Sequence, residues 1–266
     1  MGSDAATRAI IFDLDDTLLA QDVSDHAALR ATCMGVSEEY GVDPAGLVEA
    51  VQRRARSSWY GTPTGDYCHA IGISPVEGLW ARFLGDNPNL RALRAWGPIY
   101  RRDVWSRALA DRGVRDLARA EELSERFQRE RRARHVVYPE VEATLTRLRG
   151  AYRLALLTNG APDLQREKLA GAGLAHHFAT IVVSGDVGIG KPDRRIFDLV
   201  LNRLDVPASA AVMVGDSRAR DIAGAQGAGI RAVWINRAAA RRHDGDDGIV
   251  PDAEIAHLDD VPISLR

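Results

Sequence analysis

Ile10-Ile11-Phe12-Asp13-Leu14-Asp15-Asp16-Thr17 is a short apolar run that ends in acids and a hydroxyl. Short runs of aliphatic and β-branched residues are typical of buried parallel strands. In an extended strand, residues two apart point the same way, which would put Asp13 and Asp15 on one side. Because ligands of an open parallel sheet bind beyond the carboxyl ends of its strands, we expect a ligand site directly after Phe12.

Four further apolar runs have the same character as the first one at Ala9–Phe12, and they are Leu154–Leu157, Thr180–Val183, Ala211–Val214 and Ala232–Ile235. The segments between these four show helical patterns, at Pro162–Ala172, Asp193–Leu204 and Ala219–Ala228. Strands that alternate with helices predict an α/β fold, with a Rossmann-like parallel sheet covered by helices on both faces.

About 140 residues separate the first apolar run from the second, far more than one crossover needs. Helical patterns fill this region, at Ser37–Tyr40, Ala45–Arg56, Val104–Ala110 and Val114–Arg132. Glycine and proline are expected to break it at Gly61-Thr62-Pro63, Gly85-Asp86-Asn87-Pro88 and Gly97-Pro98. We therefore expect a mostly α-helical domain at 22–135, inserted into a core formed by 1–21 and 136–266. A helix is expected at Glu140–Arg149, and a flexible loop at 238–250.

The bulk composition describes an ordinary globular protein of 266 residues with 45% hydrophobic content, enough to bury a large core. Its net charge of -2 gives no electrostatic reason to bind nucleic acid or an anionic membrane. No run approaches the ~20 apolar residues of a membrane span, and the first residues do not resemble a signal peptide. Cys33 and Cys68 are expected to be free thiols in a reducing cytoplasm. We expect the protein to be a monomer or a homodimer.

The other runs also end in polar residues that could serve chemistry. Thr158 and Asn159 follow the second run, and Asp216 follows the fourth, with Asp221 five residues further on. Lys191 lies one loop beyond the third run. Taken singly, each is an ordinary turn, cap or surface residue. Carboxylates that converge repel one another by about 1–4 kcal/mol per pair at 4 Å, and Mg²⁺ relieves that repulsion because it prefers oxygen ligands.

Together these segments resemble the haloacid dehalogenase superfamily of phosphatases. Its four motifs are matched by Asp13-x-Asp15-x-Thr17, by Thr158 after an apolar strand, by Lys191-Pro192, and by Gly215-Asp216 through Asp221. The resemblance covers about residues 8–21 and 136–236. An insert directly after the first motif resembles the subfamily with a helical cap domain at that position.

The resemblance implies a role for each matched residue. Asp13 would be the nucleophile that forms an aspartyl-phosphate, and Asp15 the general acid and base. Thr158, Asn159 and Lys191 would bind the phosphoryl group. Mg²⁺ would be held by Asp13, Asp216 and the Asp15 carbonyl. Asp221 would orient Lys191 or a metal-bound water, and Thr17 would support the site. The substrate would be a small phosphorylated molecule.

Other members of the superfamily are alternatives to a phosphatase. Dehalogenases lack the second acid of the first motif, which is Asp15 here. Phosphonate hydrolases need a lysine in the cap, and residues 22–135 contain none. Ion-pumping ATPases need membrane spans. A sugar-phosphate mutase remains open because it would share Asp13 and Asp15. A binding protein without catalytic activity on the same fold remains the alternative outside the enzymes.

Substrate choice would lie in the cap domain. Arg53 and Arg56 could bind a carboxylate or second phosphate, and Trp59 or Tyr60 could stack on a sugar or base. The ordinary interpretation is a solvated arginine face and a packed Trp59, and the same ambiguity holds for Trp80, Trp96 and Trp105. The histidines form no spacing that indicates a metal site, namely His69, His135, His176 and His177. A nucleotide, a sugar phosphate or a phosphorylated natural-product intermediate would all fit.

Overall fold

The computed structural model describes residues 6–237 and 248–261. Two compact units divide the chain. The core unit consists of Met1–Ala20, Val137–Asn159 and Ala172–Arg266, and the helical unit of Gln21–Val136 and Gly160–Gly171. The loop expected at 238–250 lies mostly outside the described residues. The sequence-based division assigned residues 160–171 to the parallel-sheet core, whereas the contacts place them in the helical unit.

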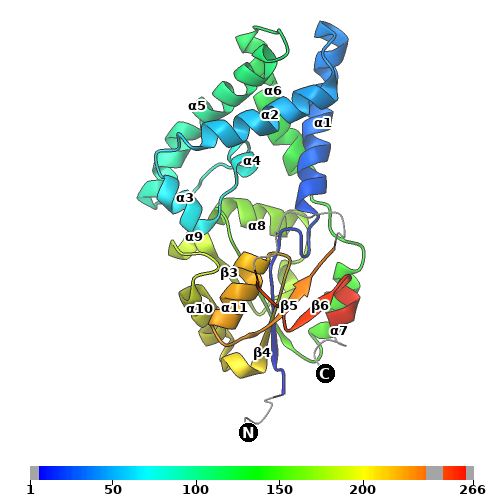
Figure 1. Ribbon diagram of the computed structural model, residues 1–266, viewed down its shortest axis with the longest axis vertical. Helices are drawn as coiled ribbons and strands as arrows, with labels where there is room; N and C mark the ends of the chain where they lie inside the picture. The colour runs from blue at the N-terminus through cyan, green and yellow to red at the C-terminus, as the bar shows by residue number, and fades with distance from the viewer. Residues whose placement is uncertain (1–5, 238–247, 262–266) are drawn as a thin grey trace. The chain divides into compact units, whose positions relative to one another are not determined.

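The described residues of the core unit form a six-stranded parallel sheet in the order β3-β2-β1-β4-β5-β6 (Figure 1). Its strands are β1 Ala9–Phe12, β2 Arg153–Thr158, β3 Thr180–Val183, β4 Ala211–Gly215, β5 Arg231–Ile235 and β6 Ala253–Ile255. The predicted α/β parallel-sheet fold is confirmed. Phe12 is in register with Leu156 and Val214, so β1, β2 and β4 deliver their following residues to one edge.

Helices of the core unit pack against the sheet through buried apolar side chains. The helix α10 (Arg194–Leu204) buries Ile196, Phe197, Val200, Leu201 and Leu204, the spacing expected of an amphipathic helix. These side chains meet alternate strand residues such as Ile11, Leu157 and Met213. The remaining core helices are α7 Val141–Leu148, α9 Ser184–Val187 and α11 Ala223–Gly227, with short helical turns at Ala175–His177, Ala208–Ala210, Arg218–Ile222 and Leu258–Asp260.

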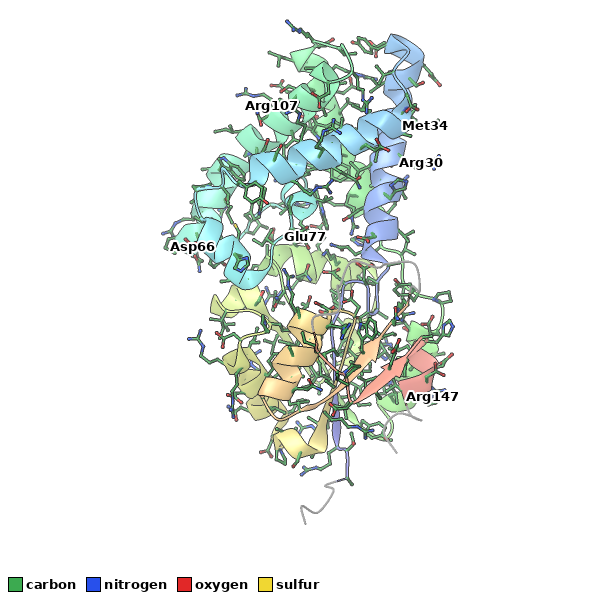
Figure 2. The ribbon with its side chains drawn as sticks, viewed as in Figure 1. Arg30, Met34, Asp66, Glu77, Arg107 and Arg147 are labelled. Atoms are coloured by element: carbon green, nitrogen blue, oxygen red, sulfur yellow. The ribbon has the colours of Figure 1, made fainter. Side chains whose placement is uncertain are left out.

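The helical unit packs long helices around an apolar centre. Its members are α1 Gln21–Tyr40, α2 Pro44–Trp59, α3 Gly65–Ile71, α4 Pro75–Gly78, α5 Pro88–Ala110, α6 Leu117–Arg132 and α8 Pro162–Gly171 (Figure 1). Asp43 and Asn87 cap α2 and α5, each followed by a proline in the first turn. Trp80 and Trp105 are fully buried. Arg30 and Met34 lie on the exposed side of α1 (Figure 2).

One predicted break is wrong. Gly97 and Pro98 lie inside α5, which continues to Ala110. Pro98 cannot donate to the carbonyl of Arg94, an interior position that costs about 3 kcal/mol. The helix continues because its buried residues on both sides anchor it: Leu93 and Val104 are fully buried, and the Tyr100 hydroxyl donates to the Pro75 carbonyl at 2.8 Å. The breaks at Gly61–Pro63 and Gly85–Pro88 are confirmed.

Cys33 and Cys68 are free, as expected, and both are buried. Burial raises the pKa of the Cys33 thiol to about 12, so it remains protonated as a small apolar side chain. Within the described residues, no helix is both long and apolar enough to cross a membrane.

Candidate active site

Asp13 is the first residue after β1 and is almost completely buried. Its N–H donates to the Val214 carbonyl at 3.0 Å, which fixes the backbone at the end of the strand. Its Oδ1 lies 2.5 Å from Nζ of Lys191, and the Thr17 hydroxyl donates to its Oδ2 at 3.4 Å. Burial raises the pKa of Asp13 to about 7, although Lys191 opposes that shift. Asp13 is therefore a carboxylate whose charge depends on nearby cations.

Lys191 joins two carboxylates. Its Nζ lies 2.5 Å from Asp13 and 2.6 Å from Oδ1 of Asp221. Burial opposes its charge, but the two carboxylates outweigh burial and raise the pKa of Lys191 above its ordinary value. The side chain therefore remains an ammonium at neutral pH.

Asn159 holds the backbone of Lys191 from the end of β2. The amide oxygen of Asn159 accepts from the Lys191 N–H at 2.9 Å, and its amide nitrogen donates to the Lys191 carbonyl at 3.0 Å. Residues 32 apart in sequence are thus joined by a matched pair of hydrogen bonds. Asn159 therefore positions Lys191 through its backbone. Contact of Asn159 with a phosphoryl group stays a prediction.

Asp216 and Asp221 follow Gly215, which is the last residue of β4. A Cβ on Gly215 would lie 2.3 Å from Oδ2 of Asp221, so only glycine allows this approach. The same carboxylate accepts from the Ser217 N–H at 3.0 Å, and the Asp216 carbonyl accepts from the Trp234 indole at 2.8 Å. Burial, with Asp13 and Asp221 nearby, raises the pKa of Asp216 well above its ordinary value.

The carboxylates of Asp13, Asp216 and Asp221 form a candidate cation site. One oxygen from each lies within 4.8 Å of the others. Lys191 balances only part of that negative charge. Burial is the main cause of the raised pKa values of Asp13 and Asp216, and the neighbouring carboxylates raise them further. An all-oxygen donor set with excess negative charge fits a hard divalent cation such as Mg²⁺.

The remaining predicted residues lie on the adjoining segments. Thr158 ends β2 and is 1% exposed, and Thr17 is fully buried. Asp15 forms a bridge with Leu19, in a turn that Asp16 makes with a positive φ of 56°. The structure therefore places Thr158 at the end of β2, and Asp15 and Thr17 in the turn after β1.

Arg237 was missed by the sequence analysis. It follows β5 and donates to the Thr17 carbonyl at 2.9 and 2.7 Å, to Glu140 at 2.5 Å, and lies 3.6 Å above the Tyr138 ring. Arg237 thus fixes the turn that carries Asp15 and Thr17. The rule that residues following parallel strands gather at one edge could have found it, since it is two residues past Ile235.

The tentative substrate residues lie on and beyond the end of α2 in the helical unit. Arg53 is paired with Asp111 at 3.1 Å, beside Arg54. Trp59 is half-buried, with ring centroids 5.7 Å from Trp96 and 5.3 Å from Tyr100. Tyr60 is 91% exposed. Contact of Arg53, Arg56, Trp59 or Tyr60 with a substrate stays a prediction.

Comparison with known proteins identifies the family. A family model described as haloacid dehalogenase-like hydrolase matches residues 7–229. The phosphoserine phosphatase of Thermus thermophilus is 44% identical over 255 residues, covering 96% of this chain and 97% of that protein. The 2-haloacid dehalogenase structure from Pseudomonas syringae pv. Tomato DC3000 is 31% identical, with a TM-score of 0.59 and coverage of 97% and 98%. The magnesium-bound Bacillus subtilis protein YfnB superposes with a TM-score of 0.65 over 98% and 99% of the chains; at 23% identity this shows the fold alone.

The chain therefore belongs to the haloacid dehalogenase-like hydrolases, because the family model spans most of it. The family resemblance seen in the sequence is confirmed. The expectation of an enzyme that hydrolyses phosphoric monoesters is confirmed as well.

Proposed function

We propose that the chain is a magnesium-dependent phosphatase that hydrolyses a small phosphorylated metabolite through an aspartyl-phosphate on Asp13. The observation that carries the proposal is the buried Lys191 ammonium between Asp13 and Asp221, beside the further carboxylate of Asp216. Phosphoryl transfer depends on positioning and charge neutralisation, and this cluster supplies both.

In the first step, a carboxylate oxygen of Asp13 attacks the phosphorus atom. The ester P–O bond breaks, its electron pair leaves with the alcohol oxygen, and Asp15 donates a proton to that oxygen. In the second step, Asp15 removes a proton from water, whose oxygen attacks phosphorus. The bond between phosphorus and Asp13 breaks, inorganic phosphate leaves, and Asp15 is protonated again.

The other residues would hold the phosphoryl group and the metal. Lys191 and Thr158 would bind phosphoryl oxygens, and Asn159 would keep Lys191 in place through its backbone. The side chains of Asp13 and Asp216, with the Asp15 carbonyl, would hold Mg²⁺. When bound, Mg²⁺ neutralises the negative charge that the phosphoryl group brings to the carboxylates. Asp221, already 2.6 Å from Lys191, would orient the ammonium.

We propose O-phosphoserine as the first substrate to test. The support is the Thermus thermophilus phosphoserine phosphatase, which is 44% identical over nearly the whole of both chains. The helical unit would act as the cap domain that selects the substrate. Monomer or homodimer, and a place in the cytoplasm, stay predictions.

Dehalogenation is the first alternative, since a 2-haloacid dehalogenase is among the similar structures. Asp15 favours the phosphatase, because phosphoester cleavage needs an acid for the leaving alcohol. A sugar-phosphate mutase stays the second alternative, and it would return an isomeric phosphate ester rather than inorganic phosphate.

The test measures inorganic phosphate released from O-phosphoserine, nucleotides and sugar phosphates, with Mg²⁺ and after chelation. We expect release that depends on Mg²⁺ and is lost in Asp15→Asn, with O-phosphoserine among the best substrates. Asp198→Asn is the matched control, because Asp198 lies in an exposed ion pair on α10. An isomeric ester as the product would favour the mutase, and halide release from 2-haloacids without phosphate release would overturn the phosphatase.

A further inference from the structure

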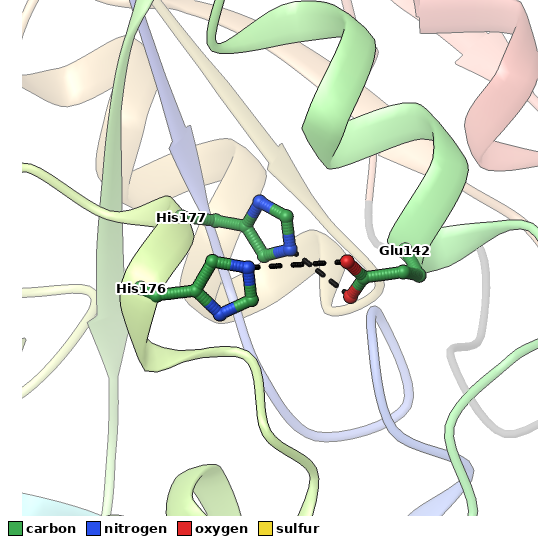
Figure 3. Close-up of side chains that lie close together, drawn as sticks. All are labelled: Glu142, His176 and His177. Carbon is green, nitrogen blue, oxygen red and sulfur yellow. Dashed lines mark hydrogen bonds and ion pairs between the residues drawn. The ribbon is translucent and has the colours of Figure 1, made fainter.

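Two histidines and a glutamate meet in the core unit, in a cluster separate from the carboxylates of Asp13, Asp216 and Asp221. Glu142 lies in the first turn of α7, and His176 and His177 form the short turn before β3. Figure 3 shows both imidazole rings directed at the one carboxylate. Nε2 of His177 lies 3.0 Å from Oε2 of Glu142, and Nε2 of His176 lies 3.9 Å from Oε1.

The hydrogen bond of His176 determines which of its ring nitrogens can bind a cation. Nδ1 of His176 lies 2.8 Å from the Gly173 carbonyl, which can only accept, so Nδ1 carries the proton. In the neutral ring, Nε2 then presents a lone pair toward the Glu142 carboxylate. Two acceptors that face each other need a donor or a cation between them, such as a proton, a water molecule or a metal ion. A backbone carbonyl that holds the far nitrogen of an imidazole is the usual support of a metal-ligating histidine.

The cluster is buried at one of its three side chains and exposed to solvent at the other two. The side chain of His177 is completely buried, whereas 60% of Glu142 and 55% of His176 is exposed. One potential ligand atom from each residue lies within 4.8 Å of the others. A dissolved ion could therefore reach the cluster, and water could complete its coordination.

The chemistry of the donors selects the kind of metal. Imidazole nitrogens suit zinc, copper and nickel, while Mg²⁺ prefers oxygen ligands. Two histidines and one glutamate, with an open position, are a ligand set that Zn²⁺ accepts. The spacing of these residues indicates no metal site, because Glu142 and the His176-His177 pair are far apart in sequence and meet only in the fold.

We infer that Glu142, His176 and His177 form a binding site for Zn²⁺ or a similar transition-metal dication. A bound ion would tie the start of α7 to the turn before β3 and would stabilise the core unit, since the unfolded chain holds Glu142 apart from the histidines. The site lies on residues that the proposed reaction does not use.

The test is calorimetric titration of the whole protein with Zn²⁺ in excess Mg²⁺, which keeps the carboxylate cluster occupied. We expect one Zn²⁺ per chain, a rise in melting temperature, and affinity at least about tenfold weaker in His176→Ala and in Glu142→Gln. Both residues are exposed, so the variants should fold. His257→Ala is the matched control, because His257 is an exposed histidine of the same unit.

Cu²⁺ provides a second readout, through the nitrogen hyperfine structure of its electron paramagnetic resonance spectrum. We expect two imidazole nitrogens in the native protein and one in His176→Ala. Asp216→Asn should lose phosphate release but keep the Zn²⁺ site, which separates this inference from the proposed function. Binding unchanged in both His176→Ala and Glu142→Gln, or no binding by the native protein, would leave only an ion pair and overturn the site.

Discussion

The only two lysines in the sequence are both buried, one in each unit, and their surroundings differ. Lys191 in the core unit contacts Asp13 and Asp221, with Asp216 close by, so negative charge is in excess. Lys168 in the helical unit forms an ion pair with Glu77 at 2.7 Å. We propose a further cation for the first cluster, whereas Lys168 and Glu77 form an ion pair of opposite charges.

A second ion pair completes the cluster of the helical unit. Arg131 is paired with Asp25 and lies 4.7 Å from the Trp80 ring. Gln21 links the two pairs, because its amide oxygen accepts from Arg131 at 3.2 Å and its amide nitrogen donates to Glu77 at 3.4 Å. The charges are balanced and hydrogen-bonded, as buried structural ion pairs must be. Figure 2 labels Glu77 in this unit.

Burial of a charged side chain therefore does not by itself mark a functional site. Both lysine side chains are buried from solvent, and both form ion pairs with carboxylates. The cluster around Lys191 lies at the carboxyl ends of strands, where we propose that a cation and a phosphoryl group bind. The balanced cluster joins α4, α6, α8 and the start of α1 and holds helices together.

The largest effect is expected for Asp13→Asn. The amide is a poor nucleophile, so we expect kcat for phosphate release to fall by at least about 10³-fold. The melting temperature should fall little, because the variant removes one of several crowded carboxylates. Parallel phosphate assays and thermal melts check this, and a variant that keeps a tenth of the native kcat would remove Asp13 from the chemistry.

The opposite pattern is expected for Lys168→Met. The substitution leaves Glu77 buried without its cation, which costs about 3–5 kcal/mol in the free energy of unfolding. The kcat of the folded fraction should change far less than in Asp13→Asn. Urea unfolding followed by circular dichroism measures the loss, and Lys191→Met is the counterpart that should lose activity. Equal stability of Lys168→Met and native protein would show that the balanced cluster does not hold the helices.

A smaller effect is expected from pH through Asp25. Burial raises its pKa to about 6, although Arg131 opposes the shift. The folded carboxyl thus keeps its proton to higher pH than the unfolded one, whose pKa is near 3.8. Its contribution to the free energy of unfolding should fall by at most about 3 kcal/mol as pH rises from about 4 to about 6. Urea unfolding of the native protein and of Asp25→Asn across this pH range measures the contribution of Asp25. If the free energy of unfolding of the native protein, relative to that of the variant, rises with pH, the expectation is wrong.

The smallest effect is expected for Arg53→Ala. Its guanidinium is exposed and paired with Asp111, and exposed ion pairs contribute little to stability. We expect stability and KM for O-phosphoserine close to the native values. A large rise in KM, with kcat unchanged, would mean that Arg53 leaves Asp111 to bind the substrate.

Sequence patterns predicted the parts of the fold where local and tertiary preferences agree. Ala9–Phe12 and Thr180–Val183 are strands with the predicted bounds. The strand β6 was missed because Ile255 is its only buried residue, which leaves no apolar run to detect. The break expected at Gly97-Pro98 failed because burial around it outweighs the lost hydrogen bond of Pro98.

The candidate site followed a similar division. Asp13, Lys191, Asp216 and Asp221 come together because parallel strands share one edge, a rule that needs only the order of elements. The hydrogen bonds of Asn159 with the Lys191 backbone and of Arg237 with the Thr17 carbonyl depend on side-chain directions, which the order of elements does not predict. The cluster of Glu142 with His176 and His177 depends on the packing of α7, which no spacing reveals.

We propose above all that Asp13 carries the phosphoryl group during turnover. The most direct measurement quenches the enzyme during hydrolysis of O-phosphoserine and reduces the acyl phosphate with borohydride. Mass spectrometry of the digested protein then locates the modified residue. We expect homoserine at position 13, and only when both substrate and Mg²⁺ are present. Homoserine at position 15 or another acid, with Asp13 unmodified while phosphate is released, would contradict it.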